Sequence, residues 1–284
     1  MQLDARAANL GGMGTIAAAI LGLTIFGLGD PPSPEVAAAL AELRSPRAEV
    51  RGSAAVRLGR LGARGTEPID ALARLARADP DADVRGYAVS SLGQLGPPAA
   101  AAVPSLIAAA ADPSMDVAKR AIVALGEIGP GAREALPLLR DRLASADPFL
   151  RRITARALGG LAASAAAAAP DLIDVLQADD DLGARREAAR ALGRIAKPAA
   201  EIVAALISAL EDDEPALRLD AATALGEMGP PAIAAREPLR RMAANDHLDG
   251  LAHAARVALS ALESRVAPAP SMPPTALKPF PPPE

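Results

Sequence analysis

The chain has 284 residues, no cysteine and 1% aromatic residues, and its 30 Lys and Arg nearly balance its 34 Asp and Glu. The lack of cysteine excludes disulfides, thiolate zinc sites, iron–sulfur clusters and cysteine nucleophiles, and the scarcity of aromatic residues argues against β-sandwiches and barrels. Because the charges nearly cancel, no overall field attracts nucleic acid or an anionic membrane.

The first predicted element is an apolar helix at the N-terminus. Residues 7–29 carry no charged side chain, and at 1.5 Å per residue such a helix is about 35 Å long, enough to cross a hydrocarbon core of about 30 Å. Gly14, Ala18 and Gly22 recur at every fourth position, which suits close packing against another membrane helix. We therefore predict that residues 1–33 hold a single-pass membrane anchor with these three small residues as its packing positions.

Two alternatives for this segment stay open. Residues 16–28 suit the apolar core of a cleaved secretory signal, in which case the mature protein begins near Asp30 and is a periplasmic or secreted repeat protein. The segment also suits a buried helix that caps the first repeat. The few basic residues on its two sides leave the membrane topology undecided.

The central part, residues 34–264, repeats with a period of 33 or 34 residues. One leucine recurs in register seven times, as Leu58, Leu92, Leu125, Leu158, Leu192, Leu225 and Leu259. Apolar residues eight and four positions before it and three positions after it form one stripe of an α-helix. A second helix follows a Gly/Pro turn, and in most copies it opens with proline. Because stacked hairpins bury stripes that one hairpin leaves exposed, we predict an all-α fold, a right-handed α-solenoid of about seven helical hairpins.

Three further columns of the repeat predict how each leucine-bearing helix begins, packs and ends. The helix N-caps are predicted at Ser45, Asp79, Asp112, Ser145, Asp179, Asp212 and Asp246. Close helix crossings are predicted at the glycines that follow the leucine, Gly59, Gly93, Gly126, Gly159, Gly193 and Gly226. Left-handed residues that stop the helix are predicted at Gly62, Gly96, Gly129 and Gly229, with Ala162, Ala196 and Glu263 in the same column of the other copies.

The runs 79–96 and 214–229 resemble the short HEAT-like repeat that also occurs in phycobilisome-lyase-type proteins. The shared features are a Val-Arg or Leu-Arg pair, an alanine four residues before the leucine, and the Leu-Gly pair. The resemblance implies a binding scaffold, since HEAT-like solenoids mostly serve in that way. The arginine of the pair recurs as Arg51, Arg85, Arg151, Arg185 and Arg218, while Ala118 and Ala252 depart from it. We interpret these arginines as structural partners of the aspartates at the turns.

The last predicted segment, residues 265–284, is a proline-rich tail. Its eight prolines prevent a helix or a central strand and favour an extended polyproline II conformation. Two interpretations remain open: a solvated tail, or a strap that docks on a partner through Leu277, Lys278 and Phe280.

The sequence carries no pattern that is typical of catalysis or of metal or cofactor binding. His247 and His253 lack the spacing of a paired helical metal site. The acidic clusters at 179–181 and 211–214 lie at inter-repeat turns and lack calcium-loop spacing. No strand precedes the glycines, so no phosphate-binding loop is predicted. We therefore expect no catalytic residue, cofactor, metal, nucleic acid or small-molecule substrate.

These features together predict a non-catalytic protein–protein interaction scaffold. The favoured hypothesis is a membrane-anchored accessory or assembly subunit of a larger membrane protein complex, whose partners are other protein subunits. A second hypothesis, from the resemblance, is a bilin-lyase-like HEAT protein that handles a tetrapyrrole-bearing partner. The third is the periplasmic or secreted repeat protein that signal cleavage would release.

Overall fold

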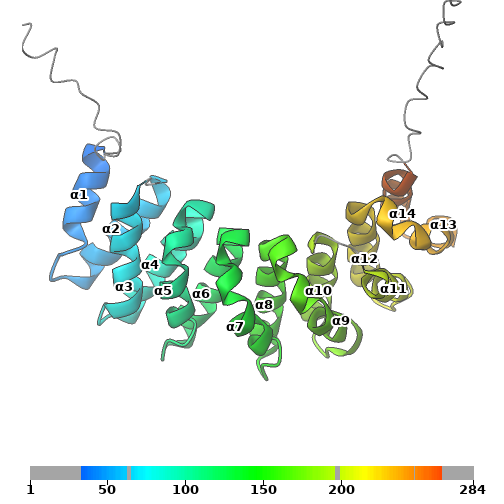
Figure 1. Cartoon of the computed structure of the whole chain (residues 1–284), viewed down its shortest axis with the longest axis horizontal. Coiled ribbons are helices and arrows are strands. Elements are labelled where there is room, and N and C mark those ends of the chain that lie inside the picture. The colour runs from blue at the N-terminus through cyan, green and yellow to red at the C-terminus, as the bar shows by residue number, and fades with distance from the viewer. Residues whose placement is uncertain (1–32, 63–64, 196–198, 246, 264–284) are drawn as a thin grey trace, which may run out of the picture.

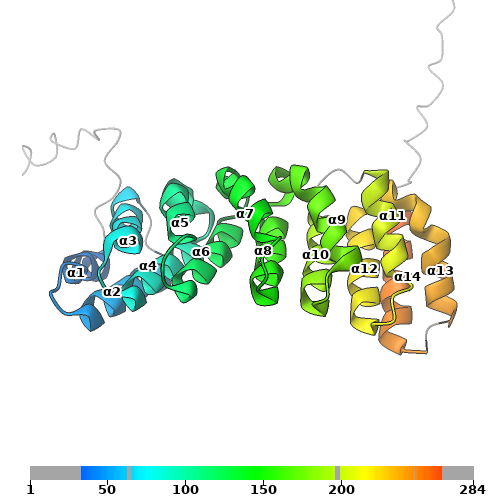
Figure 2. The same cartoon turned by 90° about the horizontal axis from the view of Figure 1, so that it is seen from below.

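The computed structural model describes residues 33–62, 65–195, 199–245 and 247–263, and all regular structure in them is helical. The helices form an arc of stacked units (Figure 1). Two rows of helices run along this arc, as the view from below shows (Figure 2). The inner row consists of α2 (Ala48–Arg60), α4 (Ala82–Leu95), α6 (Met115–Ile128), α8 (Pro148–Leu161), α10 (Leu182–Arg194), α12 (Pro215–Met228) and α14 (Asp249–Glu263).

The outer row consists of shorter helices, and short 3₁₀ segments connect four of them to the inner row. Its helices are α1 (Pro34–Glu42), α3 (Thr66–Ala78), α5 (Val103–Ala109), α7 (Leu136–Arg142), α9 (Ala169–Ala178), α11 (Ala200–Ala209) and α13 (Arg236–Asn245). The 3₁₀ segments are η1 (Pro97–Ala102), η2 (Gly129–Ala135), η3 (Ala162–Ala168) and η4 (Pro230–Ala235). In Figure 1, α9, α11 and α13 lie further from the inside of the arc than α10, α12 and α14.

The packed hairpins differ from the predicted ones in which turn closes them. Each outer helix packs on the inner helix that follows it, so that α3 pairs with α4, α9 with α10 and α13 with α14. A short turn closes each pair, and it contains an acidic residue in every pair except α1–α2, whereas the Gly/Pro segment links one pair to the next. The reason is length, because a tight turn holds two antiparallel helices together while a 3₁₀ segment separates the helices that it joins. The described residues contain seven such pairs, and the predicted solenoid of stacked hairpins is confirmed.

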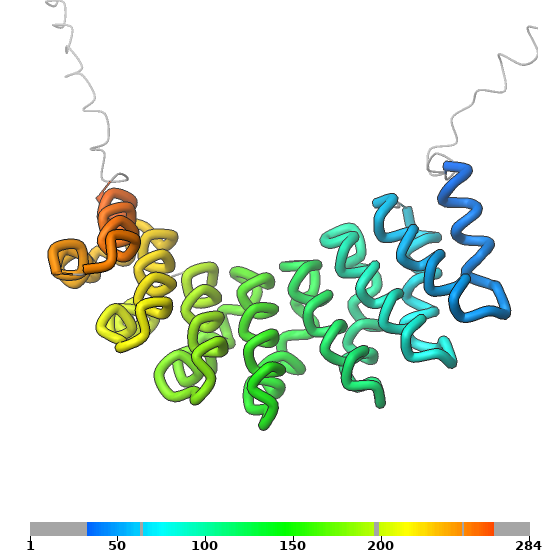
Figure 3. The backbone as a smooth tube through the Cα atoms, turned by 180° about the vertical axis from the view of Figure 1, so that it is seen from behind, coloured from blue at the N-terminus to red at the C-terminus, as the bar shows by residue number. Residues whose placement is uncertain are grey.

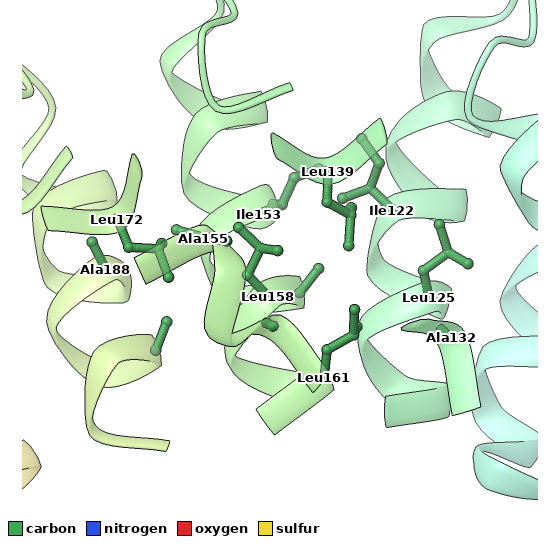
Figure 4. Packing of buried hydrophobic residues seen from close by; sticks show 14 of the residues in the cluster. Ile122, Leu125, Ala132, Leu139, Ile153, Ala155, Leu158, Leu161, Leu172 and Ala188 are labelled. Atoms are coloured by element: carbon green, nitrogen blue, oxygen red, sulfur yellow. The ribbon is translucent and has the colours of Figure 1, made fainter. Parts of the chain in front are cut away.

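The leucine column forms the centre of the core. The side chains of Leu58, Leu92, Leu125, Leu158, Leu192 and Leu225 have no exposed surface. Figure 4 shows the side chains of Leu125, Leu158 and Leu161 in the space between helices, in one buried cluster with Leu139 and Leu172 of the outer row. Since each unit shares its apolar stripe with both neighbours, the solenoid has one continuous core rather than seven separate ones.

The predicted close crossings are present between inner helices. A Cβ added to Gly126 would lie 2.7 Å from the Cα of Ala157, and one added to Gly193 would lie 2.8 Å from the Cβ of Ala224. At these crossings the backbones of neighbouring inner helices come close together, whereas 3₁₀ segments lengthen the connections to four of the outer helices. The unequal spacing of the two rows bends the stack into the arc that the backbone traces (Figure 3).

The predicted helix N-caps are wrong by two residues in the first six copies, and the seventh, Asp246, lies outside the described residues. The actual N-caps include Asp81, Asp147 and Asp181, whose carboxylates accept hydrogen bonds from backbone amides of the first helical turn. The predicted column lies earlier, in the turn, where Asp79 Oδ1 accepts from the amide of Asp81 at 3.0 Å and Asp179 does likewise with Asp181. Serine and aspartate favour both positions, which is why their presence alone misplaced the helix start.

The positive-φ helix stops are confirmed at the four glycines and at Ala162, whereas Ala196 lies outside the described residues and Glu263 still belongs to α14. Gly62, Gly96, Gly129 and Gly229 have φ between 60° and 75°. Ala162 takes the same place after α8 with φ 49° and ψ −130°, and it is the one non-glycine residue with positive φ in the described part of the chain. A side chain is strained in this conformation.

Two predicted segments lie outside the described residues: the anchor segment 1–33 except for Ser33, with Gly14, Ala18 and Gly22, and the tail 265–284, with Leu277, Lys278 and Phe280. Within the described residues, one helical run, Pro148–Ala178, is long and apolar enough by composition to cross a membrane. That run is not one straight helix, because the chain turns at Ala162 with positive φ. It consists of α8 in the inner row, the 3₁₀ segment η3, and α9 in the outer row. The apolar composition of this run is therefore explained by the side chains that it contributes to the solenoid core.

Candidate interaction surface

The two aromatic side chains in the described residues lie on the exposed face of the inner row. Tyr87 on α4 is 42% exposed and Phe149 on α8 is 45% exposed. Aromatic rings normally contribute large buried area to a core, and this chain has only one tyrosine and three phenylalanines in all. The core is built from Leu, Ile, Val and Ala instead, so the aromatic residues of the solenoid face solvent.

Phe149 is held in place by the start of its helix and by two cations. Asp147 caps α8 and accepts a hydrogen bond from the Phe149 amide at 2.9 Å. The ammonium of Lys119 lies 5.0 Å from the centre of the ring, and the guanidinium of Arg152 lies 4.9 Å from it, both within cation–π range. Lys119 also forms an ion pair with Asp147 at 2.6 Å, which lowers the pKa of that carboxyl.

Two hollows of the inner face meet at Phe149 and share its ring and the side chain of Ile153. One, of about 430 Å³, lies over α4, α6 and α8, and the other, of about 230 Å³, lies between α8 and α10. We call the two together the Phe149 groove. The first hollow is also lined by Ser90, Gln94, Asp116, Lys119, Arg120, Val123 and Glu127, and the second by Arg152, Arg156, Gly183, Arg186, Glu187 and Arg190.

The α8–α10 half of the groove is basic. Its four arginines are Arg152, Arg156, Arg186 and Arg190. The buried carboxylate of Asp220 on α12 binds the last two, with Nε–Oδ distances of 2.7 and 2.9 Å, and Glu187 lies 3.2 Å from the last. The first two have no carboxylate within ion-pair distance among the described residues. This half therefore has a surplus of positive charge in a chain of net charge −4.

The α4–α6 half is polar and partly acidic. Asp116 pairs with Arg120 at 2.6 Å, and the Arg120 guanidinium also donates to the hydroxyl of Ser90. Glu127 lies over the glycine-lined crossing of α4 and α6, where desolvation raises the pKa of its carboxyl, opposed by the charge of Arg156. The two halves thus differ in charge: the α8–α10 half is net positive, whereas the two acids of the α4–α6 half are balanced by Lys119 and Arg120.

Tyr87 occupies a separate hollow of about 630 Å³ between α2 and α4. Its ring lies over Gly52, where an added Cβ would come within 2.9 Å of the Tyr87 Cδ2. Glu49, Arg57 and Arg60 line the other side of this hollow. The inner face therefore carries two aromatic hollows, one toward the N-terminal end and one at the middle of the solenoid.

The arginine ladder lies at the turns and is structural, as the sequence indicated. Arg51 donates two hydrogen bonds to Asp79, both at 2.7 Å, and a third to the backbone oxygen of Ser45 at 3.0 Å. Arg85 and Arg151 repeat this arrangement in their own units. The arginine lowers the pKa of the aspartate against the effect of its burial. Each arginine thus ties the turn before its own helix to the turn of the next unit.

The other candidate residues are not brought together into a site. His247 and His253 are exposed at the C-terminal end of the solenoid. Of the acidic clusters, Asp179 pairs with Arg151 and Asp181 caps α10. No group of three or more His, Asp or Glu in the described residues has a metal-binding arrangement. Sequence analysis missed the Phe149 groove, although one signal was present: Phe149 stands where the three preceding units carry an acid, Glu49, Asp83 and Asp116.

The family profile of HEAT repeats matches residues 36–108, 69–159, 103–186 and 169–260 in overlapping segments. The chain belongs to the HEAT repeat family. The match runs over both rows of helices and includes the whole Phe149 groove. No curated protein sequence matches this HEAT protein.

Solved structures with the same fold come from several sources. The complex of CpcE and CpcF of phycocyanin lyase from Nostoc sp. PCC7120 aligns with a TM-score of 0.52 at 23% identity, over 84% of this chain and 98% of that one. A HEAT-like repeat protein from the archaeon Thermococcus onnurineus NA1 aligns with a TM-score of 0.53 at 16% identity, over 83% and 99%. An engineered protein aligns with a TM-score of 0.57 at 22% identity, over 80% and 68%. These similarities establish the fold.

Proposed function

We propose that this HEAT protein is a scaffold that binds another protein along the inner face of its arc. The observation that carries the proposal is the placement of Tyr87 and Phe149, both exposed and both on the inner row beside arginines. Aromatic residues and arginine are the types enriched at the centres of protein interfaces. A surface of this kind recognises a partner by contact and needs no catalytic group.

Photo-crosslinking in the native cell tests this proposal. A benzoylphenylalanine at position 87 or 149 of the full-length chain is expected to trap the same partner, identified by mass spectrometry. Ile233 provides the matched control, because it is 46% exposed but lies in η4 and lines neither aromatic hollow. Crosslinks of equal yield from position 233, or none from the inner face, would count against the inner face as the binding surface.

The membrane-anchored role belongs to the same proposal. Residues 7–29 carry no charge and are long enough to span a bilayer, and an anchor of this kind would hold the solenoid at the membrane surface as an accessory or assembly subunit. The full-length chain is expected to stay with membranes after a carbonate wash, whereas a chain without residues 1–33 is expected in the supernatant. Recovery of the full-length chain in the supernatant would refute the anchor. A mature N-terminus near Asp30 would favour the periplasmic or secreted alternative.

A second candidate function is a role like that of a phycocyanin lyase subunit. It is supported by the shared fold with the CpcE–CpcF complex, which aligns over nearly the whole length of that chain. Visible absorbance that co-purifies with the protein, or transfer of a chromophore to an acceptor protein in vitro, would favour this candidate over the scaffold.

A further inference from the structure

We propose that the Phe149 groove binds an extended segment of the partner protein in which an apolar side chain is followed or preceded by acidic residues. This inference rests on the proposed scaffold function and names the chemistry of its ligand. The apolar side chain would lie against Phe149, and the acidic residues would lie over Arg152 and Arg156.

The shape of the groove suits a peptide in extended conformation. The two hollows lie end to end over α4, α6, α8 and α10. Neighbouring helices pack 8–10 Å apart, so four of them cover about 27 Å, the length of about eight residues of extended chain. At the middle, the half-exposed ring of Phe149 and the side chain of Val123 offer apolar surface for one side chain of the ligand.

The charges set the acidic character of the ligand. Arg152 and Arg156 have no carboxylate partner within ion-pair distance among the described residues, whereas Arg186 and Arg190 are held by Asp220. The guanidinium of Arg152 already lies at the ring of Phe149, so an apolar contact and a charge-assisted hydrogen bond are available side by side. A carboxylate on the ligand would give these two arginines an ion-pair partner.

The same geometry disfavours a nucleic acid. A strand of phosphates carries a charge at every step, and along this groove it would pass the carboxylates of Asp116, Glu127 and Glu187. Base stacking also needs several aromatic platforms, and the groove contains one. A protein segment, in contrast, can place its acidic residues at one end alone and leave neutral or basic groups at the other.

Peptide binding to the full-length chain in mild detergent tests the proposal. The probes are labelled synthetic peptides with a Gly-Ser background, a central Leu or Phe and adjacent Asp residues, compared with the same peptides in which Asp is replaced by Asn. The acidic peptides are expected to bind and the neutral ones to bind at least about ten-fold more weakly. The variant that combines Arg152→Gln with Arg156→Gln, and separately Phe149→Ala, should each lower affinity for the acidic peptides on the order of ten-fold. Labelled oligo(dT) serves as the nucleic-acid probe.

Arg133→Gln is the control for lost positive charge, because Arg133 is exposed in η2, outside the groove; it removes one positive charge, where the double variant removes two. Unchanged melting temperatures would show that the groove variants are folded, as expected for exposed side chains. The proposal is overturned by any of three results: no acidic peptide binds at about millimolar concentration, Asn peptides bind as well as Asp peptides, or oligo(dT) binds more tightly than the peptides. In each of these cases, inner-face crosslinks to a protein would still leave the scaffold function standing.

Discussion

The junction between α6 and α8 differs from the junctions on either side of it. At α2–α4, α4–α6 and α8–α10, an arginine of one unit forms a two-fold hydrogen bond with an aspartate in the next turn. At α6–α8 both partners are replaced, by Ala118 and Ser145. The loss of both members together leaves no unpaired buried charge, which would otherwise be strongly destabilising.

The neutral junction is also the one that carries the centre of the Phe149 groove. Here Lys119, next to Ala118, forms the ion pair with Asp147 and lies against the ring of Phe149. The inter-unit charge contact has therefore moved from the turn to the inner face. One unit thus replaces the arginine–aspartate contact of the turn by an ion pair on the inner face, and this replacement lies at the centre of the proposed binding surface.

Gly193→Leu tests what the two kinds of junction share and should have the largest effect. The new side chain would meet Ala224 at backbone distance, since even a Cβ would lie 2.8 Å from the Ala224 Cβ and 2.9 Å from its Cα. We expect a loss of about 3 kcal/mol, measured by urea unfolding. Gly250→Leu is the control, because a Cβ there has nothing within 4 Å. Gly126→Leu, at the neutral junction, should behave like Gly193→Leu, and a much smaller loss there would show that the neutral junction packs differently.

Asp179→Ala tests the charged junction and should have the next largest effect. The Asp179 side chain is 4% exposed and that of Arg151 is 13% exposed, so the substitution leaves a largely enclosed guanidinium without its main partner. We expect a loss of about 2 kcal/mol in thermal or urea unfolding. Ser145→Ala, at the corresponding position of the neutral junction, should cost well under half as much. Equal losses for the two variants would show that the ladder adds nothing to its junctions.

Acid should weaken the charged junctions specifically. The pKa values of Asp79, Asp112 and Asp179 lie below the ordinary value, because each carboxylate accepts hydrogen bonds from an arginine and a backbone amide. The unfolded chain therefore binds more protons than the folded one, so stability is fully present above pH of about 4 and is lost as the pH falls through the lower folded values. The urea midpoint should drop over this range in the wild type and drop less in a variant with Asp79→Asn and Asp179→Asn. The same drop in both would assign the acid sensitivity to other groups.

Much of the fold was predictable because the repeat makes every buried position visible several times. The columns of Leu125 and Gly126 mark the core and the helix crossings directly, since a buried site imposes the same demand in every unit. The helix start was misplaced because aspartate serves both as an N-cap, as in Asp81, and as a turn residue, as in Asp79. Two neighbouring helices form a hairpin when the turn between them is tight. Because the two kinds of turn alternate along a repeat, the sequence alone did not show which of them closes the hairpin.

The candidate site was hidden for the opposite reason. Exposed columns of the inner row vary from unit to unit, because no buried site imposes the same residue on each copy. Phe149 ends a run of three acids in its column, and Ala118 is one of two exceptions in the arginine column, but only the folded chain brings Lys119, Phe149 and Arg152 together. A search for departures from the exposed columns would have pointed to α8.

The pair Ala118→Arg with Ser145→Asp tests whether a charged bridge can be restored at the neutral junction. Ala118 is buried where Arg51 lies in its own unit, so the new side chains should reach each other across the turn. We expect a gain of about 1 kcal/mol, measured by thermal unfolding, with Ala118→Arg alone neutral or destabilising. A double variant that is less stable than either single variant would show that the neutral pair is required by the packing of this junction.

Ala162→Gly should have the smallest effect and concerns the same unit. The residue after α8 has φ 49° and ψ −130°, whereas Gly96, Gly129 and Gly229 stand at the corresponding place of their units with similar angles. Glycine removes the strain of the side chain but gives the unfolded chain more freedom, so the net gain should be about 0.5–1 kcal/mol. The control is Gly129→Ala, which should lose a similar amount because it creates the strain that Ala162 already bears. Thermal unfolding of the two variants should move in opposite directions. If both lower the melting temperature, the side chain of Ala162 contributes packing that outweighs its strain. The unit that carries Phe149 would then differ from the other units at the end of α8 as well as on the inner face.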